Sequence, residues 1–241
     1  MNKPSVTIIT ATTGTKYLQQ NIDSVRKQTY KNVDHLVVID GYQYKHKLSY
    51  MDIPAAVNKV FLPYNTGHDQ YNGHRIYGAG TFLAKGDYII YLDEDNWLEP
   101  THVESLVNTI GGKQWAYSLR KITNMAGEFV CNDDCESLGP QHVSVINDYL
   151  VDVNCFFIEK KLAVSLCSYW YRRARNPNEQ PEVDRMLTQV LMENFIVGAP
   201  TNQYTVNYRA GNRADSVQPE FFLKGNEYMK QRLNGDLPWK K

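Results

Sequence analysis

Three acidic residues in a row, Asp93, Glu94 and Asp95, follow directly after an apolar run in this sequence. Carboxylates packed this closely repel one another, so a cation beside them would be strongly favoured. Asp93 and Asp95 are two positions apart, and in an extended chain their side chains therefore point the same way. Oxygen ligands suit Mg²⁺ or Mn²⁺, which usually complete their coordination with water and substrate phosphates. The spacing predicts a site for one of these ions, with Asp95 and Asp93 as its metal ligands.

A second interpretation of the three acids needs no metal. Acidic residues after a strand also occur at the start of helices, and Glu99-Pro100-Thr101 is a typical beginning for the helix that follows. An isolated Asp-x-Asp would favour this second interpretation. The residues that precede the acids decide between the two.

Those preceding residues predict strands whose ends meet at one edge of a sheet. Short apolar runs rich in β-branched residues predict four strands, over residues 5–10, 35–39, 59–62 and 88–92. The spacing of Leu18, Ile22 and Val25 predicts an amphipathic helix over residues 17–28. Strands joined by such a helix are parallel, and ligands bind at the carboxyl edge of parallel sheets. Thr10, Asp40 and the three acids are all expected at that edge.

The second half of the chain predicts a more mixed arrangement. Residues 114–122 and 128–130 flank the turn-like Asn124-Met125-Ala126-Gly127 and predict a hairpin. Further strands are expected over residues 150–158, 195–198 and 203–209, and helices over residues 72–84, 101–110, 160–171 and 181–195. Residues 133–145 are polar and irregular, which is typical of a loop over a cleft. The basic, aromatic tail from residue 221 is expected to form a helix packed on the domain.

Composition narrows the class of protein. The 241 residues include 26 basic and 26 acidic ones, and this neutrality argues against a nucleic-acid partner. No run approaches the roughly 20 apolar residues of a membrane span, and the first residues lack a signal-peptide core, so a cytoplasmic location is expected. The cysteines do not have zinc-site spacing, and we expect them to be reduced: Cys131, Cys135, Cys155 and Cys167.

Several short motifs occur in a recognisable order. In the first hundred residues they are Val6 to Thr12, Ser24 to Tyr30, Val37 to Gly41, Asn65-Thr66-Gly67, Arg75, and Ala84 to Tyr88 leading to the three acids. Beyond about residue 100 only islands match, namely Val151 to Cys155, an acid near Asp184, and Tyr208-Arg209. Each motif alone is weak, but their ordered combination is specific. The chain resembles the family 2 glycosyltransferases of the GT-A fold.

The resemblance implies a fold and a donor site. It implies one α/β domain of the GT-A fold over residues 1–241, in which a mostly parallel nucleotide-binding sheet is flanked by helices. Residues 1–100 would bind the nucleotide sugar, residues 101–220 would form a smaller mixed acceptor-side portion, and residues 221–241 would be a tail. The donor would contact Thr10, Ala11, Thr12, Asp40, Arg75, Asp93 and Glu94. Asp95 would bind the Mn²⁺ or Mg²⁺ that bridges the two phosphates.

The resemblance also implies the reaction, in which a sugar moves from the nucleotide to an acceptor hydroxyl with inversion at the anomeric carbon. The hydroxyl then needs a general base, for which Asp184 is the first candidate and Glu182 the second. An aspartate with an ordinary pKa is ionised at pH 7 and is competent without tuning. Because relatives commonly have Glu-Asp where this chain has Glu182-Val183-Asp184, either acid can be the base. Alternatively, Asp184 only complements the dipole of its helix.

Two further functions stay open from the sequence. A nucleotidyltransferase acting on sugar phosphates would usually carry a glycine-rich loop with Lys or Arg after the first strand, whereas residues 11–15 contain one Gly and no Arg. A non-catalytic nucleotide- or sugar-binding module on the same fold is the other alternative. For the enzyme we expect a uridine or other pyrimidine nucleotide sugar as donor. The acceptor would be a glycan, a lipid-linked glycan or a protein, with peripheral membrane contact allowed.

Overall fold

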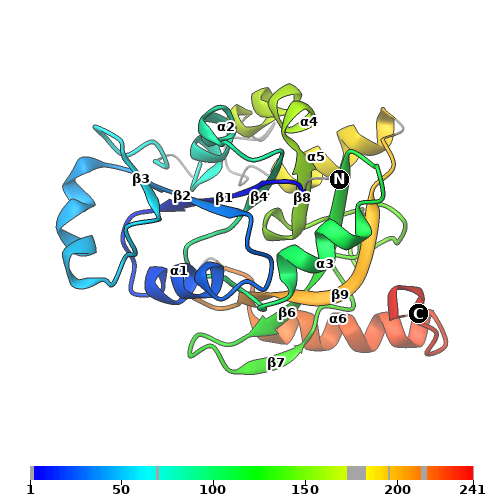
Figure 1. Cartoon of the computed structure of the whole chain (residues 1–241). Helices are drawn as coiled ribbons and strands as arrows, with labels where there is room; N and C mark the ends of the chain where they lie inside the picture. Colours follow the sequence, from blue (N-terminus) through cyan, green and yellow to red (C-terminus); the bar gives the residue numbers. More distant parts are fainter. Residues whose placement is uncertain (1–2, 69–70, 173–182, 195, 213–215, 241) are drawn as a thin grey trace.

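The computed structural model describes residues 3–68, 71–172, 183–194, 196–212 and 216–240. Four parallel strands form its first half, in the spatial order β3-β2-β1-β4 (Figure 1). Their bounds are Val6–Thr12 for β1, Val33–Ile39 for β2, Asn58–Phe61 for β3 and Tyr88–Tyr91 for β4. The pairings of β1 with β2 and β4, and of β2 with β3, are all parallel, which confirms the prediction. Every residue of β1 is buried, as expected for a strand covered on both faces.

The sheet continues through strands of mixed direction. β8 pairs antiparallel with both β4 and β6, β6 pairs parallel with β9, and β9 pairs antiparallel with β5. β7 pairs antiparallel with β6, which confirms the predicted hairpin. The bounds are Trp97–Leu98 for β5, Trp115–Thr123 for β6, Phe129–Asn132 for β7, Phe156–Glu159 for β8 and Ala199–Arg209 for β9. The described residues thus form one mixed sheet with a parallel first half.

Helices cover both faces of this sheet. α1 and α3 lie on one side, and α2 and α4 lie on the other (Figure 1). The helices span Leu18–Arg26 for α1, His74–Leu83 for α2, His102–Thr109 for α3, Lys160–Ser165 for α4 and Val183–Glu193 for α5. The apolar stripe of α5 is Val183, Leu187 and Leu191, and all three side chains are buried in the main core.

The C-terminal segment builds a second, smaller core. α6 (Pro219–Arg232) packs on β6 and β7, and its Phe222 and Met229 are buried there together with Trp239. The Trp239 indole Nε1 donates to Asp134 Oδ1 at 2.9 Å, and Lys240 Nζ is 2.6 Å from Asp134 Oδ2. The predicted packed tail is therefore confirmed.

The strand predicted over residues 150–158 is correct only at its end. Val153–Cys155 forms a 3₁₀ turn, η2, and β8 begins at Phe156. The Asp152 carboxylate accepts from the Asn154 backbone N–H and caps the turn. A short acidic side chain that bonds its own backbone in this way competes with strand pairing.

Two other element predictions need correction. The helix predicted over residues 160–171 ends at Ser165 and is followed by a 3₁₀ helix, η3 (Cys167–Tyr171). The strand predicted over residues 195–198 is absent from residues 196–198, because β9 begins at Ala199; Phe195 lies outside the described residues.

The segment 133–145 was expected to lie over a cleft, and this is wrong for its first half. Asp133, Cys135 and Leu138 are buried between β6 and α6. The Asp133 carboxylate accepts from the backbone N–H groups of Cys135 and Glu136 and pairs with Arg120 of β6. Its polar residues are therefore satisfied inside the protein, which a count of polar residues cannot reveal.

Among the described residues, no helix is long and apolar enough to cross a membrane.

Candidate active site

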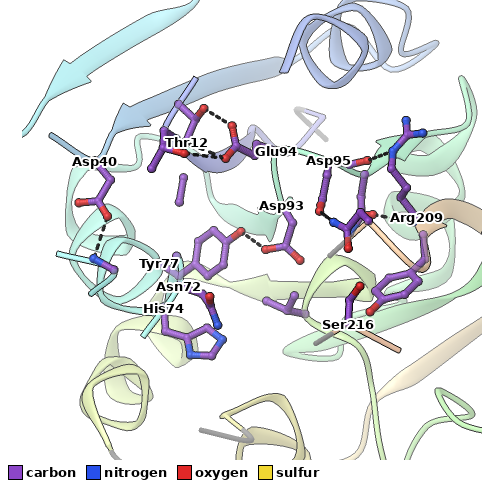
Figure 2. A pocket seen from close by; sticks show the side chains of 18 of the residues that line it. Thr12, Asp40, Asn72, His74, Tyr77, Asp93, Glu94, Asp95, Arg209 and Ser216 are labelled. Carbon is purple, nitrogen blue, oxygen red and sulfur yellow. Dashed lines mark hydrogen bonds between the residues drawn. The ribbon is translucent and has the colours of Figure 1, made fainter. Parts of the chain in front are cut away.

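A pocket of about 380 Å³ opens at the carboxyl ends of β1, β2 and β4 (Figure 2). Its volume lies within the range of small-molecule sites. Most of the lining comes from the ends of those strands, the start of α2 and the end of β9. The lining includes Ala11, Thr12, Asp40, Gly67, Asn72, Gly73, His74, Tyr77, Asp93, Glu94, Asp95, Val153, Tyr208, Arg209, Asn212 and Ser216. The three acids therefore face a shared cavity with Asp40 and the end of β1.

The Asp93 carboxylate is held by two side chains. Tyr77 donates its hydroxyl to Asp93 Oδ1 at 2.5 Å, and Asn154 Nδ2 donates to Oδ2 at 2.9 Å. Burial raises the pKa of Asp93 to about 6; the two hydrogen bonds oppose this shift and the nearby charge of Asp152 adds to it. A desolvated carboxylate crowded by other acids gains from a nearby cation.

Asp95 lies on the other side of the pocket, beside the end of β9. Burial, together with the charges of Asp93 and Glu94, raises its pKa to about 7 against the attraction of Arg209. Arg209 Nε donates to the Asp95 backbone oxygen at 3.0 Å, and Asn212 Nδ2 bonds Asp95 Oδ2 (Figure 2).

Glu94 is engaged by the loop that follows β1. Its carboxylate accepts from the Thr12 hydroxyl at 2.5 Å and from the backbone N–H groups of Thr13 and Thr15 at 3.3 and 3.0 Å. Glu94 was expected to contact the donor. It lines the pocket, and its bonds also fix the loop that forms one wall.

Asp40, like Glu94, both lines the pocket and holds a neighbouring loop. It lines the pocket, and its carboxylate accepts from the Thr66 N–H at 2.7 Å and the Gly67 N–H at 2.8 Å. Arg75, also expected at the donor, lies behind this loop: its Nη1 donates to the Thr66 carbonyl at 3.0 Å and its guanidinium stacks on Tyr71. Arg75 is not among the pocket-lining residues, so in this structure it supports the loop.

Thr10 requires a correction. Ala11 and Thr12 line the pocket, but the Thr10 side chain is fully buried. Its hydroxyl bonds His35 Nε2 at 3.0 Å and Asn21 Oδ1 at 3.2 Å. Thr10 lies two residues before the end of β1, and these bonds hold its side chain in the core rather than at the pocket.

Of the two candidate general bases, the structure describes only Asp184. Glu182 lies outside the described residues. Asp184 is half-buried at the start of α5 and is not among the pocket-lining residues. Burial raises its pKa to about 7, and the charge of Asp152 adds to the shift while Arg185 opposes it. The expectation of an ordinary pKa is therefore wrong, because the surroundings of Asp184 are acidic and poorly solvated.

Several pocket residues were missed or undervalued from the sequence. Tyr77 had no signal apart from its place in a glycine-rich helix. His74 also lines the pocket; its Nδ1 is buried and has no hydrogen-bond partner among the described residues, and burial lowers its pKa to about 4. Asn212 and Ser216 lie just past the Tyr208-Arg209 motif, which was the nearest available signal.

The residues that could hold a divalent cation are Asp95 and Asp93. Both are oxygen ligands with raised pKa values and both face the pocket, so they fit Mg²⁺ or Mn²⁺. In the described part of the chain, no group of three or more His, Cys, Asp or Glu side chains forms a complete cation site. A cation here would therefore need further oxygen ligands, as these ions commonly take from water and phosphates.

An α/β fold with a pocket at the carboxyl ends of its parallel strands has the arrangement in which such proteins commonly bind ligands. Residues 5–117 match the family model described as Glycosyl transferase family 2.

Two curated relatives are also glycosyltransferases. The chain is 28% identical over 131 residues to the putative glycosyltransferase EpsH of Bacillus subtilis (strain 168), across 54% of this chain and 36% of that protein. It is 30% identical over 107 residues to the glycosyltransferase GlyA of Streptococcus pneumoniae serotype 4, across 39% of this chain and 13% of that protein. The chain thus spans only about a third or less of these relatives.

Solved structures of S. aureus TarS share the fold. The TarS 1–349 complex with UDP superposes with a TM-score of 0.59 at 14% identity, covering 86% of this chain and 60% of that one. The TarS 1–349 complex with UDP-GlcNAc has a TM-score of 0.54 at 13% identity, covering 98% of this chain and 68% of that one. At this identity the comparison establishes the GT-A fold alone.

Proposed function

We propose that this protein transfers a sugar from a nucleoside diphosphate sugar to an acceptor hydroxyl, with inversion at the anomeric carbon. The observation that carries the proposal is that Asp93, Glu94 and Asp95 line one pocket with Ala11, Thr12 and Asp40, within a region that matches the family 2 glycosyltransferase model. Uridine is the base we favour, since the structurally similar TarS is seen with UDP.

On the donor side, the loop after β1 and the loop that holds Asp40 would enclose the nucleoside. Asp95, with Asp93 beside it, would hold a Mn²⁺ or Mg²⁺ ion on the diphosphate. When bound, this ion supplies positive charge that stabilises the departing phosphate. The protein itself keeps the two carboxylates close and poorly solvated, which strengthens their interaction with positive charge.

On the acceptor side, Asp184 is the proposed general base. The acceptor oxygen bonds to the anomeric carbon, its proton passes to the Asp184 carboxylate, and the bond from that carbon to the diphosphate oxygen breaks with its electron pair. A pKa near 7 suits a group that must be ionised yet take up a proton near neutral pH. Glu182 remains the second candidate for this role.

Slow hydrolysis of nucleotide sugars in the presence of Mn²⁺ tests the proposal. A panel of uridine, guanosine, cytidine, thymidine and adenosine diphosphate sugars would identify the donor. Asp95→Ala should remove both turnover and Mn²⁺-dependent nucleotide binding, whereas Asp184→Asn should keep binding and stop transfer. Wild-type nucleotide affinity that is the same with and without EDTA would count against the proposed cation.

A non-catalytic binding module is the second candidate, because Asp184 is not among the pocket-lining residues. The same panel separates the two functions. A module would bind a nucleotide sugar in a Mn²⁺-dependent way and release it unchanged, even with a series of glycan, lipid-linked and protein acceptors. A cytoplasmic location and peripheral membrane contact stay predictions from the sequence.

A further inference from the structure

Asn154 lies in the core immediately behind the pocket and contacts Asp93 twice. It is fully buried at the 3₁₀ turn before β8. Its Oδ1 accepts from the Asp93 backbone N–H at 2.7 Å, and its Nδ2 donates to Asp93 Oδ2 at 2.9 Å. A second Nδ2 bond, at 2.8 Å, reaches Asp152 Oδ1. The acceptor faces an N–H and the donors face carboxylates, so the chemistry of its neighbours fixes the orientation of this amide.

Asp152 is in turn held by a buried arginine. Arg120 is 2% exposed and forms ion pairs with Asp152, Asp133 and Glu136, while its guanidinium lies 4.4 Å from the ring centroid of Tyr208. Asp152 is also buried, and it caps the turn through the Asn154 N–H at 2.9 Å. Moving Asp152 would leave buried charges unpaired, which is strongly unfavourable. The Arg120–Asp152 pair is therefore a fixed support for the Asn154 amide.

The opposite oxygen of Asp93 is fixed from α2. Tyr77, which donates to it, is 1% exposed and packs against the rings of Tyr91 and Trp170 at 5.2 and 5.4 Å between centroids. The Asp93 carboxylate is thus hydrogen-bonded on both oxygens by buried side chains from separate elements, Tyr77 of α2 and Asn154 of η2. Asp95, by contrast, meets Asn212 and Arg209 from the end of β9.

We propose that Asn154, oriented by Asp152 and Arg120, is a positioning residue that aims the Asp93 carboxylate into the donor pocket. The inference rests on the proposed function and adds a residue to it that lies outside the pocket lining. Groups that orient carboxylates beside a cation commonly change cation affinity by roughly 10- to 100-fold when they are altered.

A purely structural role for Asn154 makes a different prediction. In that case the important bond is the one from the Asp93 N–H to Asn154 Oδ1, which satisfies a buried backbone donor. Asn154→Asp separates the two roles, because it keeps the shape and this acceptor. It replaces the Nδ2 donor with an oxygen that faces the carboxylates of Asp93 and Asp152, so the Asp93 side chain should turn away.

The experiment is calorimetric titration of UDP, or of whichever nucleoside diphosphate the wild type binds, in Mn²⁺ and separately in EDTA. We expect Asn154→Asp to weaken the Mn²⁺-dependent affinity by roughly tenfold or more, and to leave the affinity in EDTA within about twofold of wild type. Asn108→Asp is the matched control, since Asn108 is exposed on α3 and outside the pocket. It should change neither affinity.

The possible outcomes are distinct. If wild type fails to bind any nucleoside diphosphate, the proposed function fails first. If wild type binds and Asn154→Asp binds equally well in Mn²⁺, or loses affinity equally in Mn²⁺ and EDTA, the positioning role is wrong. Asn154→Ala adds no charge but removes both the Nδ2 donor and the acceptor for the Asp93 N–H, and it should also lose more affinity in Mn²⁺ than in EDTA. Failure of both variants to fold would make Asn154 a residue of the fold alone and would overturn the proposal.

Discussion

At the scale of single residues, the acidic side chains of this protein differ in the hydrogen bonds that their carboxylates accept. Asp40 and Glu94 each accept from backbone N–H groups of neighbouring loops, so they shape the walls of the pocket as well as lining it. Within the described part of the chain, Asp184 Oδ1 accepts from the Arg185 N–H at 2.9 Å. Its raised pKa therefore reflects a carboxylate that burial destabilises.

Asp184→Asn should stabilise the protein at high pH while stopping the proposed transfer. The pKa of Asp184 is raised in the folded state, so ionisation of this group does not affect the stability of the protein below about pH 4. The stability falls as the pH rises from about 4 to about 7, because the carboxyl group ionises more readily in the unfolded chain. The neutral amide avoids that loss. We expect the variant to be more stable by on the order of 1 kcal/mol at pH 8 and equally stable at pH 4. Urea unfolding at both pH values measures this; equal stability at pH 8 would contradict it.

At the scale of elements, the loop between β3 and α2 holds Asp40 through a very close approach of its backbone. A Cβ added at Gly67 would lie 2.4 Å from the Asn72 carbonyl oxygen and 3.0 Å from Asp40 Oδ2. Only a residue without a side chain fits there. The loop and the carboxylate are therefore packed as one unit.

Gly67→Ala should move the loop between β3 and α2 away from the Asp40 carboxylate and weaken nucleotide binding. Because the added methyl group meets backbone, the loop must shift and the N–H bonds to Asp40 should lengthen or break. We expect about a tenfold loss of nucleotide affinity, equivalent to about 1.4 kcal/mol.

Gly112→Ala is the matched control. No atom of the described residues lies within 4 Å of a Cβ at Gly112, although its φ of +78° disfavours alanine. The control should lose about 1 kcal/mol of stability and keep its nucleotide affinity. Calorimetric titration and urea unfolding of both variants check the prediction, and equal affinities for Gly67→Ala and wild type would refute it.

The elements that the sequence predicts well are those with one dominant periodicity. The parallel strands and the amphipathic stripe of α5 follow from local apolar patterns, and so does the edge at which Asp40 and the acids meet. Residues 150–155 could not be predicted in this way, because Asp152 and Asn154 take their conformation from Arg120 and Asp93, which are distant in sequence. The same reason hid the support role of Arg75 and the burial of Thr10.

At the scale of the whole molecule, buried histidines and a buried aspartate change the stability of the fold with pH in opposite directions. His35 and His102 are buried and neutral, and burial lowers the pKa of each to about 3. Their contribution to stability is complete above about pH 6.5 and is lost as the pH falls toward 3. Asp184 acts in the opposite sense. The pH dependence of stability therefore combines opposite contributions from the buried histidines and from Asp184. Single variants separate these contributions.

His102→Gln should remove one part of this balance. His102 Nδ1 lies 2.8 Å from the Thr205 hydroxyl, and glutamine retains a partner for that hydroxyl without a group that titrates near pH 6. Between pH 6.5 and 4 the wild type should lose up to roughly 1.4 kcal/mol per pH unit more than the variant. Urea unfolding across this range measures the difference, and parallel curves for the two proteins would contradict the assignment.

The second core gives the protein a built-in chemical reporter. Cys135 is fully buried beneath α6, so close that a Cβ on Gly225 would come within 2.6 Å of its sulfur. A thiol-alkylating reagent can reach this sulfur only when α6 lifts from β6. The rate of Cys135 labelling, followed by mass spectrometry, would time the departure of that helix from the sheet, and Trp239→Ala should accelerate it because the indole fastens the end of the segment to Asp134.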